Sequence, residues 1–147
     1  MKKLLNQNLS IFLILLLLSP AVSADTEPND HDKRISLGLT AIEKAAFLSE
    51  MRQMLTSIQG IMTGLGTQDR ALIIKSAKYS GNRMARETPD SVKKKTPALF
   101  KQLGGSTHMK FEELAIRAED DDMESLAELT GDLMKNCLAC HETFKVH

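Results

Sequence analysis

Apolar side chains recur at three- and four-residue steps over a long stretch of this chain. The stripe they form consists of Phe47, Met51, Met54, Leu55, Ile58, Ile61, Met62 and Leu65. This spacing places them on one face of an α-helix of about seven turns. Thr40 and Glu43 have the spacing of a capping box, in which each side chain satisfies an orphan backbone N–H. The sequence predicts a helix that starts after Thr40 and ends at Gly64 and Gly66.

A second helix is expected between Asp69, a good N-cap residue, and about Arg86, where Thr88-Pro89 stops it. Residues 87–97 are interpreted as a polar connection. From Pro97 we expect a short helix that ends at Gly104-Gly105.

Two more helices complete the pattern. Ser106 or Thr107 is expected to cap a third long helix, and the acidic run 120–122 marks the turn into a fourth. The apolar face of the fourth helix carries Leu126, Leu129, Leu133, Cys137, His141 and Phe144.

Amphipathic helices joined by short connections bury their stripes against one another, and the usual solution is an antiparallel four-helix bundle. We therefore predict an all-α domain over residues 39–147. The chain has no Trp and 4% aromatic residues, which disfavours a β-sandwich or barrel. A formal net charge of zero removes the positive field that nucleic-acid binding normally requires.

The amino-terminal region has the composition of a secretory signal peptide. Lys2 and Lys3 precede an apolar run from Leu9 to Leu18, and Ser19-Pro20 follows it. We expect cleavage after Ala24, so that residues 1–24 are removed. The run is too short for a permanent membrane span, which needs about 20 apolar residues. Residues 25–38 are polar and are interpreted as a flexible leader.

One motif near the carboxyl end carries recognisable chemistry. Residues 137–141 read Cys-Leu-Ala-Cys-His, the C-x-x-C-H signature of c-type haem attachment. In this arrangement Cys137 and Cys140 form thioethers with the haem vinyl groups, and His141 is the proximal iron ligand. We therefore predict one covalently bound haem c. The signal peptide would deliver the chain to the periplasm, where bacterial haem attachment takes place.

The same residue types also occur in redox disulfides and in zinc sites. A C-x-x-C redox disulfide usually lies at the start of a helix, where the helix dipole lowers the thiol pKa, whereas Cys137 and Cys140 are expected near a helix end. Structural zinc needs four ligands, and the motif supplies only three.

The motif and the helical pattern together resemble class II cytochrome c, which comprises cytochrome c′ and its low-spin methionine-ligated relatives. The matching residues are Cys137, Cys140 and His141, with Phe144 where the family commonly has an aromatic residue. The resemblance implies that the first helix covers the distal side of the haem. It also makes a homodimer plausible, because class II relatives often pair through their first helices.

The distal iron ligand is less clear from the sequence. Low-spin members often have Arg-Gln followed three residues later by the ligand Met, whereas here Arg52-Gln53 is followed at that place by Thr56. Met51 is our preferred ligand, with Met54 as the alternative. A third interpretation makes both methionines core fillers.

Other polar residues are weaker candidates for the haem site. His108 is a possible ligand, and His31 and His147 are weaker ones. Arg52 is interpreted as a solvated residue that could instead pair with a haem propionate.

The expected function is a monohaem electron carrier that exchanges single electrons with redox partner proteins. An alternative is a five-coordinate haem that binds NO or CO, and a third is a haem-free helical module with a C-x-x-C redox switch. The sequence shows no nucleophile–base set for hydrolysis and no phosphate-binding glycine motif, so we do not expect an enzyme.

Overall fold

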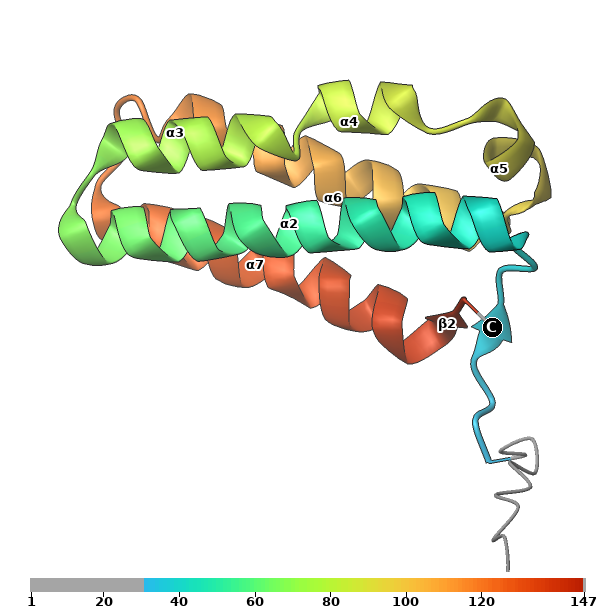
Figure 1. Cartoon of the computed structure of the whole chain (residues 1–147). Helices are drawn as coiled ribbons and strands as arrows, with labels where there is room; N and C mark the ends of the chain where they lie inside the picture. Colours follow the sequence, from blue (N-terminus) through green and yellow to red (C-terminus); the bar gives the residue numbers. More distant parts are fainter. Residues whose placement is uncertain (1–30, 147) are drawn as a thin grey trace, which may run out of the picture. The chain divides into compact units, whose positions relative to one another are not determined.

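Helices dominate the computed structural model, which describes residues 31–146 and is shown in Figure 1. The predicted signal peptide, the leader residues 25–30 and His147 lie outside the described residues. In chain order the elements are β1 (Ile35–Ser36), α2 (Ala41–Thr67), α3 (Arg70–Tyr79), α4 (Asn82–Glu87), α5 (Asp90–Lys95), α6 (Ala98–Arg117), α7 (Met123–Thr143) and β2 (Phe144–Lys145). The predicted all-α class is confirmed.

Three helix starts follow the capping signals in the sequence. Thr40 forms the complete capping box with Glu43 at the start of α2, Asp69 caps α3, and Asp122 caps α7. In each case a side-chain oxygen accepts a hydrogen bond from the backbone N–H three residues later, which satisfies one of the orphan donors of the first turn.

The helix boundaries differ from our expectations between α2 and α6. Helix α2 continues past Gly64 and Gly66 to Thr67, and Gln68 takes the left-handed conformation that ends it. The expected second helix is broken at Gly81 into α3 and α4, and the expected polar connection contains α5.

The break at Gly81 has contacts that stabilise it. The backbone N–H of Asn82 donates to Oε2 of Glu112 on α6, at 3.1 Å. The buried hydroxyl of Ser80 lies 2.8 Å from that of Ser57 on α2. The Glu112 side chain thus satisfies a backbone N–H that a continuous helix would pair within itself, and the two buried hydroxyls satisfy each other.

The short helix expected at Pro97 and the third long helix are one element, α6, which runs through Gly104-Gly105. Helix α6 packs along α7 and α3. Such packing outweighs the helix cost of glycine, about 1 kcal/mol for each residue.

A small parallel sheet corrects two further expectations. Ile35 pairs with Phe144 and Ser36 with Lys145, so the last part of the expected flexible leader is ordered. Helix α7 ends at Thr143, and Phe144 belongs to β2 instead of the predicted helix face.

The main core lies between the second half of α2, α3, and the parts of α6 and α7 next to their connection. Its fully buried members include Ile61, Ile73, Phe111, Leu114, Leu126 and Leu133. Helices α2 and α3 approach closely because Gly64 has no Cβ, which would lie 2.6 Å from Cγ1 of Ile73. Over residues 31–146, no helix combines the length and the apolar character that crossing a membrane requires.

Candidate functional site

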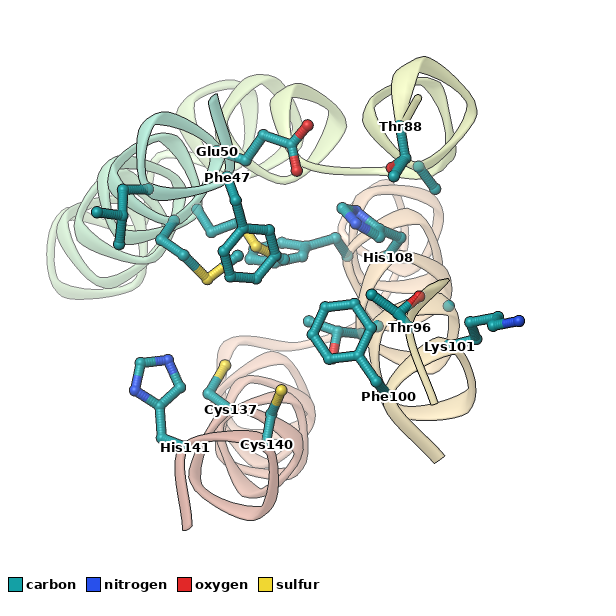
Figure 2. A pocket seen from close by; sticks show the side chains of 18 of the residues that line it. Phe47, Glu50, Thr88, Thr96, Phe100, Lys101, His108, Cys137, Cys140 and His141 are labelled. Carbon is teal, nitrogen blue, oxygen red and sulfur yellow. The ribbon is translucent and has the colours of Figure 1, made fainter. Parts of the chain in front are cut away.

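A cavity of about 760 Å³ adjoins the main core, between residues 47–58 of α2, residues 100–111 of α6 and the end of α7. Residues of α4, α5 and the segment between them complete its wall. Figure 2 shows this cavity, with α7 carrying Cys137, Cys140 and His141 on one side. Its lining is mainly apolar, and its volume is within the usual range for small-molecule and cofactor sites, about 300–1,000 Å³.

The three residues of the C-x-x-C-H motif all line this cavity. They occupy positions i, i+3 and i+4 of α7, which is the spacing that places side chains on one helix face. Both cysteines are free thiols and half-buried, whereas the His141 side chain is exposed. The motif is thus presented on the cavity wall, with its thiols toward the interior.

Burial raises the pKa of both thiols above their usual value, and the nearby Cys137 raises the pKa of Cys140 further. Both residues also lie in the last two turns of α7, where the negative end of the helix dipole disfavours a thiolate. A dithiol switch needs a low-pKa, accessible nucleophile. The raised thiol pKa values therefore disfavour a redox switch formed by Cys137 and Cys140.

A structural zinc site would need four ligand side chains close together. Within residues 31–146 there is no group of three or more His, Cys, Asp or Glu side chains arranged to hold a metal ion by themselves. The motif residues instead line one wall of a cavity with room for a large apolar group. Two free thiols and an imidazole on one apolar wall are the donor set that covalent haem attachment requires, so these residues fit haem c.

Both candidate methionines line the same cavity from α2. Met54 also packs against the main core, whereas Met51 is not among the residues that pack against it. Thr56 is exposed, and its hydroxyl donates to the backbone carbonyl of Arg52 at 3.0 Å. The position where the low-spin pattern has its ligand thus faces away from the cavity, and Met51 and Met54 remain the sulfur donors on this wall.

His108 is also part of the cavity wall, on α6 (Figure 2). Its Nδ1 atom lies 2.8 Å from the backbone carbonyl of Ser80. A carbonyl only accepts hydrogen bonds, so Nδ1 must be the protonated nitrogen, and in the neutral ring Nε2 keeps its lone pair. His31 belongs to a unit of the chain separate from the one that contains the cavity, and His147 lies outside the described residues.

Charged groups at the cavity include one that the sequence analysis missed. Glu50 is half-buried, and desolvation, followed by repulsion from Glu87, raises its pKa. Glu50 lies three residues after Phe47 and four before Met54, and this spacing predicts that it shares the apolar face of the helix. Arg52 also lines the cavity but is exposed, and no ion pair within residues 31–146 involves it.

An aromatic cluster was also missed. The rings of Phe47 and Phe100, both at the cavity, have centroids 5.7 Å apart, and Phe144 packs edge-on against Phe100 at 5.5 Å. The three residues come from α2, α6 and β2, so sequence periodicity within one helix could not reveal their contact.

Comparisons with known proteins give no assignment for this chain. No protein family matches it, and neither the curated proteins nor the solved structures contain a match.

Proposed function

We propose that this protein is a periplasmic monohaem c-type cytochrome that carries single electrons. The observation that carries the proposal is the shared cavity wall of Cys137, Cys140 and His141, with Met51 and Met54 on α2 lining the same apolar cavity. The haem-attachment motif and a cavity of suitable size and polarity thus coincide. The signal-peptide pattern of residues 1–24 supports export.

We also propose an antiparallel four-helix bundle for the domain. The bundle helices would be α2, α3 continued by α4, α6 and α7. Support comes from the packing of α2 on α3, of α3 on α6 and of α6 on α7, and from the short turns after α2 and α6. Short connections between packed helices favour antiparallel neighbours.

In the proposed site Cys137 and Cys140 would hold the haem through thioether bonds, and the imidazole of His141 would bind the iron. Met51, or alternatively Met54, would supply a sulfur ligand to the iron. When bound, a His/Met-ligated haem supplies a one-electron redox couple with a raised reduction potential and no open coordination position. The apolar side chains of the cavity, Leu48 and Ile58 among them, exclude water and lower the local dielectric constant.

Production with and without the haem-attachment machinery tests the proposal. We expect a coloured protein whose intact mass exceeds that of the mature polypeptide by one haem, and whose reduced spectrum has sharp α and β bands. Cys137→Ser and Cys140→Ser should each lose one thioether bond. Thr143→Ala, on the same last turn of α7, is the matched control and should retain both. A colourless protein at the bare polypeptide mass would contradict the proposal.

A second candidate function is favoured by the apolar character of the α2 wall. If neither methionine binds the iron, Phe47, Leu48 and Ile58 leave an apolar distal space suited to NO or CO. A broad high-spin spectrum that shifts on addition of CO would identify this case, whereas a sulfur-to-iron charge-transfer band in the far red identifies methionine ligation.

A further inference from the structure

We propose that residues 34–37, here called the N-terminal strap, are part of the candidate haem site and hold the last turn of α7, with His141, in its helical conformation. The inference rests on the proposed function only for the role of His141 toward iron. The holding contacts themselves belong to the polypeptide and can be measured without haem.

The first observation is the backbone pairing that begins directly after α7. Strands β1 and β2 are parallel, with Ile35 opposite Phe144. The N–H of Leu37 donates to the carbonyl of Lys145 at 2.9 Å. A helix end is normally where fraying begins, and a strand fixed immediately after it restricts that motion.

The second observation concerns His141 itself. The last four carbonyls of a helix lack partners within the helix. The carbonyl of Cys140 accepts from the N–H of Phe144. The next carbonyl, that of His141, accepts from Nη1 of Arg34 at 3.3 Å. A strap side chain thus satisfies an otherwise orphan carbonyl on the residue that carries the proposed ligand.

The third observation is the burial of the side chains that join the strap to the cavity wall. Leu37 is 4% exposed and Phe144 is 5% exposed, although neither belongs to the main core cluster. Phe144 packs edge-on against Phe100, whose ring is next to Phe47 at the cavity. Loosening of the strap would therefore free the end of α7 and one side of the cavity wall together, and leave α3, which does not line the cavity, intact.

The test compares three variants of the full chain by hydrogen exchange. Leu37→Pro removes both the N–H that donates to Lys145 and the buried side chain, whereas Leu37→Ala removes only most of the side chain. Ile42→Ala is the matched control, because Ile42 is an aliphatic residue of the neighbouring first turn of α2 and is 84% exposed. The amides of residues 141–146 report the end of α7, and those of α3 report the core.

We expect residues 141–146 of Leu37→Pro to exchange at least about ten-fold faster than in the unmodified chain, because local opening no longer has to break the strap contacts. Leu37→Ala should give a smaller increase, and Ile42→Ala none, with α3 unchanged throughout. The proposal would be overturned if residues 141–146 of Leu37→Pro exchanged at the unmodified rate. It would also be overturned if the amides of α3 exchanged faster by the same factor as those of residues 141–146.

The haem-loaded protein gives a second readout by electron paramagnetic resonance of the ferric iron. In Leu37→Pro we expect a second iron population with altered coordination, whereas Ile42→Ala should match the unmodified protein. Faster exchange with an unaltered iron spectrum would show that the strap does not position His141. If no haem attaches even to the unmodified chain, the proposed function fails, and the exchange data still decide whether the strap holds α7.

Discussion

The Nζ atom of Lys95 lies 2.7 Å from Oε2 of Glu43, and this ion pair joins the last residue of α5 to the first turn of α2. The other carboxylate oxygen of Glu43 accepts from the Ser91 hydroxyl at 3.0 Å. Glu43 is also the acidic member of the capping box with Thr40. One carboxylate therefore both caps α2 and holds α5, whose Val92 and Lys93 line the cavity.

These contacts make the Glu43 interactions depend on pH. The hydrogen bond from Lys95, followed by those from Thr40, lowers the pKa of Glu43 from 4.5 to about 2. A carboxyl whose pKa is lower in the folded state stabilises that state above its unfolded pKa, and the stabilisation is lost as pH falls through the folded value. We expect Glu43→Gln to lower the midpoint of thermal unfolding at pH 7, and this difference to shrink between pH 4.5 and pH 2.

Asp90→Asn is the control for that measurement. Asp90 lies in the first turn of α5, and its carboxylate is exposed and 3.8 Å from Lys93. Exposed pairs of this kind contribute little to stability. A pH profile for Glu43→Gln that parallels the unmodified protein would contradict the role assigned to Glu43.

Single substitutions distinguish which of the two cavity methionines binds the iron. Met51→Ala should abolish the sulfur-to-iron charge-transfer band of the haem-loaded protein, whereas Met54→Ala should keep it. Met54→Ala should instead lower the free energy of unfolding of the haem-free chain by about 1–2 kcal/mol, because Met54 packs against the core but is only partly buried, so the loss is smaller than at a fully buried site. Loss of the band in Met54→Ala alone would assign the sulfur to Met54, and its retention in both variants would exclude single methionine ligation at either position.

Glu50 should affect stability in the opposite direction to Glu43. Desolvation raises its pKa above 4.5, so the folded state favours the protonated form. The folded chain then binds more protons than the unfolded chain as pH rises past 4.5, and stability falls over that window. We expect Glu50→Gln to raise the thermal midpoint at pH 7 and to have little effect at pH 3, measured by circular dichroism. A loss of stability at pH 7 would indicate that the carboxylate makes a favourable contact.

Gly64 tests the close packing of α2 on α3. A Cβ at this position would lie 2.6 Å from Cγ1 of Ile73 and 2.9 Å from the Asp69 carbonyl oxygen, so Gly64→Ala should cost about 1–3 kcal/mol in denaturant unfolding. Gly66→Ala is the control in the same helix, because a Cβ there meets nothing within 4 Å. That substitution should stabilise the chain by about 0.5–1 kcal/mol. Equal effects at both positions would argue against a tight helix contact at Gly64.

Local signals in the sequence were sufficient for several features of the fold. The side chains of Thr40 and Asp69 cap helices as predicted, because a cap depends on residues only two or three positions apart. The acidic run 120–122 marks the turn into α7 as expected, and its last member, Asp122, is the N-cap residue of that helix. Helical periodicity likewise predicted the all-α class. The sequence spacing of Cys137, Cys140 and His141 was enough to place them on one helix face.

Long-range contacts decided the rest. The break at Gly81 depends on Glu112, and the continuity of α6 through Gly104-Gly105 depends on packing against α7 and α3. Strands β1 and β2 contain only two residues each, and they pair through Ile35 and Phe144. Each strand is stabilised by the other and by buried neighbours, and no local sequence pattern encodes such contacts.

The sequence by itself determined the helical class, the caps at Thr40 and Asp69, and the spacing that puts Cys137, Cys140 and His141 on one helix face, because these depend on neighbouring residues. Only the tertiary structure decided that the motif faces a cavity shared with Met51 and Met54, that Glu50 is desolvated beside it, and that Arg34 contacts the carbonyl of His141. Each of these depends on where separate helices come to lie, and that is set by the packing of the whole domain.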